Sequence, residues 1–142
     1  MIAIGCDLGA FELTERLIEH LMKRGGECKD YGTYTKDSCD YPVCAKMVAE
    51  AILSGECEEG ILLCGTGIGM SMAANKIKGI RAALCSDCFS AQATKEHNNA
   101  NVLCMGARVI GPELAFRIAD TFLDSKFSND ERHIRRISML ED

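Results

Sequence analysis

Apolar residues recur along the chain with two different spacings. Residues 11–23 carry a mostly apolar stripe at the 3.6-residue period of a helix, in which Thr14 is followed by Leu17, Ile18 and Leu21. The run Ile61-Leu62-Leu63-Cys64 is instead uninterrupted, as expected of a strand that is covered on both faces. The two spacings therefore indicate buried strands together with helices that bury only one side.

Along the whole chain this pattern predicts five strands that alternate with helices. The strands are expected at residues 2–6, 28–31, 61–64, 80–85 and 102–105. The helices are expected at 11–23, 42–53 (with Asp40 as its cap), 69–76, 86–96, 111–123 and 131–141. Such alternation is typical of right-handed βαβ units and a parallel sheet. The predicted class is α/β: one domain, residues 1–142, with a three-layer Rossmann-like fold, a five-stranded parallel sheet and helices on both faces.

Composition narrows the range of partners. The 142 residues are 47% hydrophobic and 26% charged, which is ordinary for a globular domain and excludes a coiled coil or a disordered tail. A net charge of −5 lacks the basic surface of a nucleic-acid binder. No apolar run approaches the roughly 20 residues that span a bilayer, and the first residues do not resemble a signal peptide. We therefore expect a cytoplasmic protein that binds neither nucleic acid nor membrane.

The nine cysteines favour reduced thiols, because their number is odd and their spacing shows no paired framework. Most are expected to be small buried apolar residues. The pair Cys85 and Cys88 has the C-x-x-C spacing, but a zinc site needs a second pair or a downstream histidine pair. No metal site is predicted, and a thiol redox protein remains a minor alternative.

Chemistry is expected where the parallel strands end, since ligands of such sheets bind beyond their carboxyl ends. Four predicted strands lead to polar or reactive residues there: Asp7, Asp40, Cys64 and the pair Ser86-Asp87. A predicted helix begins near each of them, and helix N-termini favour anions.

The segment Cys64-Gly65-Thr66-Gly67-Ile68-Gly69 is the strongest local signal. Glycines at alternate positions let several backbone N–H groups point into one space, which suits an anion or a developing oxyanion. The segment matches neither the P-loop nor G-x-G-x-x-G. A thiol at such a loop is favoured as a thiolate, so Cys64 could be a nucleophile or a base. The alternatives are a tight turn without a ligand and a buried thiol at a strand end.

Two further groups are candidates for proton transfer and anion binding. His97 lies in a polar run, residues 95–101, that is either a capped turn or a proton-transfer site. Arg132 and Arg136 share one helix face and could clamp a phosphate, or they form a solvated basic face. His20 is expected to be a partly exposed helix residue.

Several motifs together carry a family resemblance over nearly the whole chain. They are Gly5-Cys6-Asp7, Asp40-Tyr41-Pro42, the segment 64–69, Ala73-Ala74-Asn75-Lys76, Gly79-Ile80-Arg81-Ala82, residues 97–102, residues 106–111 and Arg132-His133…Arg136. In this order and spacing the chain resembles the B-type ribose-5-phosphate isomerases, a family that also contains the galactose-6-phosphate isomerase subunits.

The resemblance implies an isomerase without metal or cofactor that converts a phosphorylated sugar, most simply ribose 5-phosphate, through a cis-enediolate. Cys64 would be the base, and Thr66 and His97 would assist ring opening. The sugar hydroxyls would bind Asp7, Asp40, Tyr41 and Asn98, and the enediolate oxygens would bind the loop of Gly65, Gly67, Ile68 and Gly69. The phosphate would bind Arg108, Arg132 and Arg136. The family also implies a homodimer or a dimer of dimers with shared active sites, in which the helix 131–141 packs on a partner subunit.

Two departures from the family pattern surround the phosphate end. Leu8 stands where the family usually has a histidine, and Ser128-Asn129-Asp130-Glu131 replaces a common Gly-Gly pair. Leu8 cannot donate a hydrogen bond, and the acidic residues would repel a phosphate unless they point away. Two alternatives follow: an isomerase of another sugar phosphate, such as a hexose 6-phosphate of the galactose or allose type, or a non-catalytic sugar-phosphate-binding relative.

Overall fold

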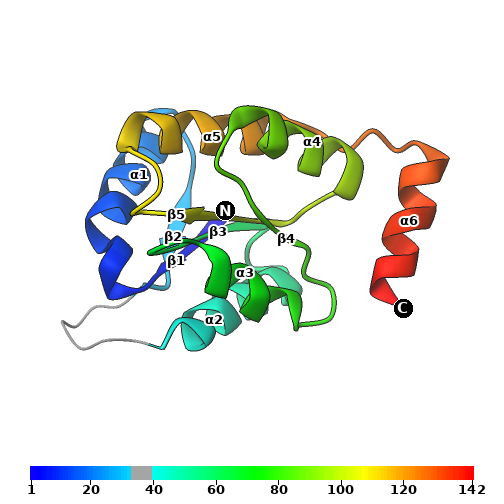
Figure 1. Cartoon of the computed structure of the whole chain (residues 1–142), viewed down its shortest axis with the longest axis horizontal. Helices are drawn as coiled ribbons and strands as arrows, with labels where there is room; N and C mark the ends of the chain where they lie inside the picture. Colours follow the sequence, from blue (N-terminus) through cyan, green and yellow to red (C-terminus); the bar gives the residue numbers. More distant parts are fainter. Residues whose placement is uncertain (33–39) are drawn as a thin grey trace.

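Five strands and six α-helices alternate in the computed structural model, which describes residues 1–32 and 40–142 (Figure 1). The strands are β1 (Ile2–Cys6), β2 (Cys28–Asp30), β3 (Glu59–Cys64), β4 (Ala82–Leu84) and β5 (Val102–Gly106). The helices are α1 (Phe11–Lys23), α2 (Tyr41–Leu53), α3 (Ile68–Asn75), α4 (Cys88–Asn98), α5 (Pro112–Asp124) and α6 (Glu131–Glu141), with a short 3₁₀ helix, η1 (Leu8–Ala10).

All five strands pair in parallel, in the order β2-β1-β3-β5-β4. The central strand β3 aligns Ile61 with Ile4 of β1 on one side and with Leu103 of β5 on the other. Its end, Cys64, lies beside Gly106. The predicted five-stranded parallel sheet is confirmed.

The sheet separates two apolar cores. Ile61 and Leu63 of β3 face α1, α4 and α5, where Phe122 is fully buried. Leu62 and Cys64 point the other way and pack against α2 and α3. Because successive side chains of a strand alternate between faces, this uninterrupted apolar run supplies both cores. The three-layer prediction is therefore correct.

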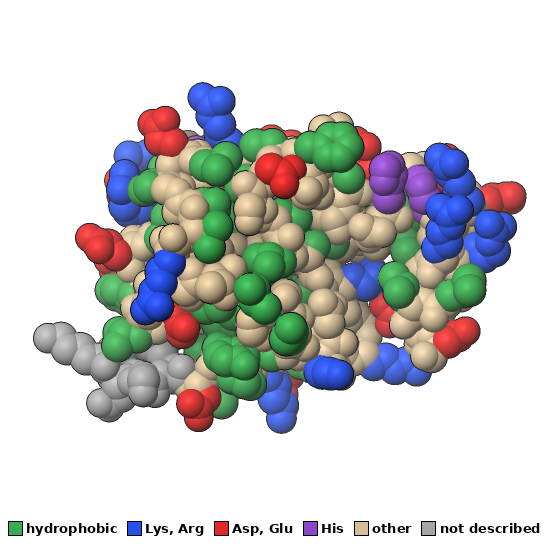
Figure 2. Space-filling view, viewed as in Figure 1, with side chains coloured by type: hydrophobic (Ala, Val, Ile, Leu, Met, Phe, Trp, Pro, Cys, Tyr) green, Lys and Arg blue, Asp and Glu red, His purple; other side chains and the backbone are tan. Residues whose placement is uncertain are grey.

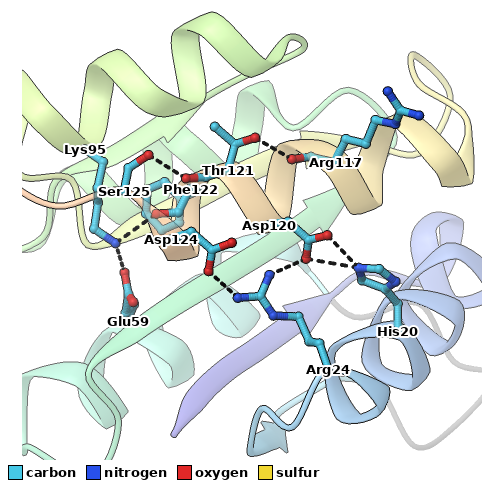
Figure 3. A network of polar contacts seen from close by, with 10 residues as sticks. All are labelled: His20, Arg24, Glu59, Lys95, Arg117, Asp120, Thr121, Phe122, Asp124 and Ser125. Atoms are coloured by element: carbon cyan, nitrogen blue, oxygen red, sulfur yellow. Dashed lines mark hydrogen bonds and ion pairs between the residues drawn. The ribbon is translucent and has the colours of Figure 1, made fainter.

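A polar network ties α1 to α5 on the first face (Figure 3). His20 Nε2 lies 3.0 Å from both carboxylate oxygens of Asp120, and its ring stacks on Phe116 with centroids 4.5 Å apart. Arg24 bonds to both Asp120 and Asp124. His20 is partly exposed, as predicted. Its partners lie about a hundred positions away in the sequence, and the sequence did not predict them.

A second polar contact in Figure 3 fixes α4 against the sheet. Lys95 is buried, forms an ion pair with Glu59 at the start of β3, and donates to the carbonyl of Phe122 at 3.2 Å. Its ammonium group also lies 4.1 Å from the centre of the Phe122 ring. The last turn of α4 is thereby held at the amino edge of the sheet.

Helix α6 stands apart from the three layers and approaches them beside the end of α4 (Figure 1). The backbone N–H of Ser128 donates to the carbonyl of Glu96 at 3.0 Å, just before α6 begins. The rings of His97 and His133 are in contact there. Across residues 1–32 and 40–142, no helix combines the length and apolar character needed to cross a membrane.

Candidate active site

Cys64 ends β3 at the point where the chain turns into α3. Its side chain is buried, and its Sγ accepts a hydrogen bond from the backbone N–H of Gly67 at 3.1 Å. Gly67 has φ +81, in the left-handed region, and directly precedes the first residue of α3. The glycine loop thus aims one backbone donor at the thiol.

Glycine is required at two positions for this loop to fit. A Cβ on Gly67 would lie 2.6 Å from the Leu84 side chain and 2.9 Å from the carbonyl carbon of Met105. A Cβ on Gly106 would lie 2.6 Å from the Thr66 backbone. The loop therefore runs against the end of β5 at a distance that leaves no room for side chains.

A cavity of about 410 Å³ opens beside the thiol at the carboxyl edge of the sheet. Its volume is within the range of about 300–1,000 Å³ typical of small-molecule sites. It is lined by Asp7, Leu8, Gly9, Tyr41, Cys64, Gly65, Thr66, Gly69 and Arg108. The lining residues that the sequence predicted as part of the site, together with Gly67 and Ile68 of the same loop, are here called the carboxyl-edge group. Its members are Asp7, Tyr41, Cys64, Gly65, Thr66, Gly67, Ile68, Gly69 and Arg108. Gly9 was not predicted as a site residue, although it follows the predicted residue Asp7 by only two positions.

Two side chains frame the loop from outside. The Tyr41 ring lies over Gly69, where an added Cβ would come within 2.7 Å of it. The Arg108 side chain lies across Gly65, and its backbone N–H donates to the Gly65 carbonyl at 3.0 Å. Asp40 occupies the N-cap position of α2 beside Tyr41, but the capping hydrogen bond that we predicted is not made.

The remaining predicted residues lie at the opposite edge of the sheet, where the parallel strands begin. Helix α4 begins after β4 and runs back along the sheet, so that Asn101, four residues after His97, bonds to the backbone of Gly60 at the start of β3. Cys64 is four residues further along β3, or about 13 Å at the usual rise of a strand. One chain therefore does not bring Cys64 and His97 together.

The residues at this second edge are His97, Asn98, Arg132 and Arg136, which we call the amino-edge group. Both arginines are exposed on α6, one turn apart. Figure 2 shows histidine side chains beside a gathering of basic side chains over α6. Asn98 lines a separate hollow of about 690 Å³ between α6 and the α3–β4 segment. The amino-edge group thus forms a positively charged surface of its own.

The other candidates have structural roles. Asp87, predicted at a strand end, caps α4 by accepting from the Ser90 N–H at 2.7 Å, which lowers the pKa of its carboxyl group. Burial raises the pKa of Cys85 to about 11, the opposite of what a redox-active thiol needs. Within the described ranges, no cluster of three or more His, Cys, Asp or Glu side chains could hold a metal ion.

Fold and site together define an α/β protein with a thiol and a glycine loop at the carboxyl edge of a parallel sheet. The family model described as "Ribose/Galactose Isomerase" matches residues 2–140. The chain belongs to this ribose/galactose isomerase family, and with it to the aldose–ketose isomerases.

Individual relatives are similar over nearly their whole length. Ribose-5-phosphate isomerase B of Escherichia coli is 46% identical over 139 residues, which are 98% of this chain and 93% of that protein. D-erythrulose-4-phosphate isomerase of Pectobacterium atrosepticum is 48% identical over 127 residues, 89% of this chain and 84% of that protein. A crystal structure of a ribose 5-phosphate isomerase from Thermotoga maritima superposes with a TM-score of 0.95 at 52% identity, covering 99% of this chain and 96% of that one.

Proposed function

We propose that this sugar-phosphate isomerase interconverts ribose 5-phosphate and ribulose 5-phosphate through a cis-enediolate, with the Cys64 thiolate as the base. The observation that carries the proposal is the position of Cys64 Sγ, at the wall of the 410 Å³ cavity and 3.1 Å from the Gly67 nitrogen. Proton abstraction beside a carbonyl needs a base and an oxyanion-binding group in one place. The names of the relatives from E. coli and T. maritima support the choice of substrate.

The reaction needs no atom from outside the substrate. Cys64 would take the proton from C2 of the open-chain aldose and return it to C1, while the proton on O2 passes to O1. A single base on a rigid strand end can reach both carbons. The negative charge that develops on the two oxygens would face the backbone N–H groups of the loop from Gly65 to Gly69, at the N-terminus of α3.

Hydroxyl groups of the sugar would bind the polar residues around the cavity. Within the described part of the chain, Oδ1 of Asp7 is buried without a hydrogen-bond partner, so a substrate hydroxyl would satisfy it. Asp40 and Tyr41 lie at the start of α2, on the same edge. Thr66 lines the cavity and is suited to assist ring opening there.

We propose that a second copy of the chain completes the site. His97 for ring opening, Asn98 for a hydroxyl, and Arg132 and Arg136 for the phosphate all belong to the amino-edge group, whereas Arg108 lies at the cavity. A symmetric dimer that sets one edge against the other would unite the two groups twice.

An exposed apolar surface near the cavity supports this dimer. Val43 and Met47 of α2 and Ile68 and Met72 of α3 are 54, 42, 45 and 64% exposed. Exposed apolar side chains on two helices that pack against each other are typical of an interaction surface. The assembly would be a homodimer or a dimer of dimers, with α6 packed on the partner subunit, and the nine cysteines support the cytoplasm as its compartment.

Leu8 favours a second candidate, an isomerase of a different sugar phosphate. Its side chain lines the cavity and is 45% exposed there, where it can offer neither a charge nor a hydrogen bond. A substrate of another length would place its phosphate elsewhere. Among hexose 6-phosphates of the galactose or allose type, the galactose type fits the family name, and a relative named for D-erythrulose 4-phosphate indicates that the substrate varies within the family.

A substrate screen tests the proposal directly. Purified protein is mixed with pentose and hexose phosphates, and products are detected by mass or NMR. We expect ribose 5-phosphate to equilibrate with ribulose 5-phosphate. Cys64→Ala should lower kcat by about 10²–10⁴-fold while substrate still binds, and the control Cys88→Ala should leave kcat unchanged. Turnover of a different sugar phosphate alone would favour the second candidate, and binding without any turnover would overturn the isomerase proposal.

A further inference from the structure

Arg81 connects two elements that carry the amino-edge group. It directly precedes β4, and its guanidinium has two partners. Nε donates to the backbone carbonyl of Asn99 at 3.0 Å, and Nη1 donates to Oε1 of Glu141 at 2.7 Å. The Arg81 and Glu141 side chains are 20 and 29% exposed. Solvent and salt therefore screen this ion pair less than a pair on the open surface.

The backbone of Arg81 is fixed as firmly as its side chain. Its N–H donates to Oδ1 of Asn101 at 2.8 Å. Its carbonyl accepts from the N–H groups of Asn101 and Val102 at 3.0 and 3.2 Å. The guanidinium thus projects from a point anchored to the start of β5.

Glu141 uses both of its carboxylate oxygens. Oε1 accepts from Arg81, and Oε2 accepts from the backbone N–H of Gly79 at 3.2 Å. The hydrogen bond from Arg81, and after it the one from Gly79, lower the pKa of the Glu141 carboxyl group. Glu141 is the last residue of α6, so these contacts tie down the end of that helix.

The two partners of Arg81 belong to the end of α4 and to α6, the two elements that carry the amino-edge group. Asn99 has φ 47 and ends α4 directly after His97 and Asn98. Glu141 ends the helix that carries Arg132 and Arg136. The hollow of about 690 Å³ lies between these elements, and the bonded side chains of Arg81 and Glu141 both line it.

We propose that Arg81 and Glu141 are positioning residues, whose ion pair sets the angle of α6 relative to the end of α4 and so fixes the amino-edge group as one unit. This inference rests on the proposed function, because the unit matters only if it binds substrate. The pair touches neither cavity nor loop at the carboxyl edge. Its loss should weaken binding of the phosphate without altering proton transfer at Cys64.

Glu141→Gln tests the proposal, because the amide keeps the size of the side chain and removes its charge. The matched control is Glu56→Gln, which removes the charge of an exposed partner of Lys29 in β2, the outermost strand on the opposite side of the sheet from β4. We expect Glu141→Gln to raise KM for the phosphorylated substrate about two- to tenfold, with kcat within about twofold of the parent. Hydrogen exchange of residues 131–141 should become faster, while that of α5 should not change.

The outcomes separate this inference from the proposed function. If the parent turns over no sugar phosphate, the proposed function fails, and unchanged exchange of α6 in Glu141→Gln would overturn the positioning role as well. If the parent is active, the role is overturned when KM and exchange match those of Glu56→Gln. An equal fall in kcat and in kcat/KM, accompanied by a lower Tm, would also overturn it, because that pattern indicates general destabilisation.

Discussion

The imidazole rings of His97 and His133 lie against each other, with their centroids 4.7 Å apart and their planes inclined by 37°. His97 is on the last turn of α4, and His133 is on the first turn of α6. His133 is buried, and its Nδ1 lies 2.7 Å from Oγ of Ser128. The contact therefore joins the start of α6 to the end of α4. The ion pair of Arg81 with Glu141 likewise joins the other end of α6 to the residue before β4.

The buried ring makes stability depend on pH. Burial, followed by the nearby His97 and Arg132, lowers the pKa of His133 from its ordinary 6.5, although Asp130 acts in the opposite direction. The unfolded chain therefore takes up this proton at a higher pH than the folded protein does. The contribution of His133 to stability is complete above about pH 6.5 and is lost as the pH falls from there to its folded pKa.

Urea unfolding at pH 8 and pH 5 measures this effect. We expect the parent to lose more stability between these values than His133→Phe, because phenylalanine retains the ring contact and does not titrate. Equal losses in the two proteins would show that His133 does not carry the dependence. The comparison cancels the contributions of the other titrating groups.

Gly67 should tolerate alanine less well than another glycine with the same backbone angle. Gly67 and Gly55 have φ +81 and +84, but a Cβ on Gly55 would meet nothing within 4 Å. Gly55→Ala should cost only the conformational term, about 1–2 kcal/mol. Gly67→Ala adds the clash with Leu84 and Met105, so that about 2–4 kcal/mol is expected in total.

The measurement is chemical denaturation, combined with kcat for each variant. Only Gly67→Ala should lower kcat, because it moves the N–H that points at Cys64. If the two variants are equally stable and equally active, the close approach of the loop to β5 does not constrain the site.

Arg136→Ala should raise KM more than it lowers kcat. A guanidinium that holds the phosphate equally well in the ground and transition states contributes to binding alone. A charge-assisted hydrogen bond of about 1.5–3 kcal/mol corresponds to a KM increase of roughly 10- to 150-fold. Steady-state kinetics with Arg135→Ala as the control separates this role from a loss of surface charge, and an equal fall in kcat and kcat/KM would contradict uniform binding.

The sequence predicted most of the fold because its local signals agree. The bounds of α1 and α6 match the predicted residues, and the apolar run ending at Cys64 correctly indicated a central strand. Strand β4 is shorter than predicted, Ala82–Leu84 against residues 80–85, because Ile80 bonds back to Ile77 in a turn. Helix α4 starts two residues later than predicted, because the Asp87 cap defines its first turn.

The sequence indicated candidate site residues, but it did not indicate how they are distributed in space. Glycine spacing identified the loop around Cys64 because the required backbone geometry is local. The contact of Arg81 with Glu141 joins residues 60 positions apart, and that of His20 with Asp120 joins residues 100 apart. The periodicity of the sequence does not predict such pairs, since they depend on how the folded helices and strands pack against one another.

Mixing two inactive variants tests whether two chains share each site. In a shared site, Cys64 comes from one chain and His97 from the other. A heterodimer of Cys64→Ala with His97→Ala then contains one doubly altered site and one fully intact site. Random reassociation should restore about a quarter of the parent activity, since about half of the dimers are mixed and one of their two sites is intact.

If each chain instead carried its own complete site, every site in the mixture would lack one of the two groups. Activity would then stay at the level of the separate variants, and the placement of His97 opposite Cys64 would have no catalytic meaning. Mixing Cys64→Ala with Cys64→Ser is the matched control, because every site in that mixture lacks the thiol in either arrangement. Recovery in the first mixture and not in the control requires that the carboxyl-edge group of one chain meets the amino-edge group of another.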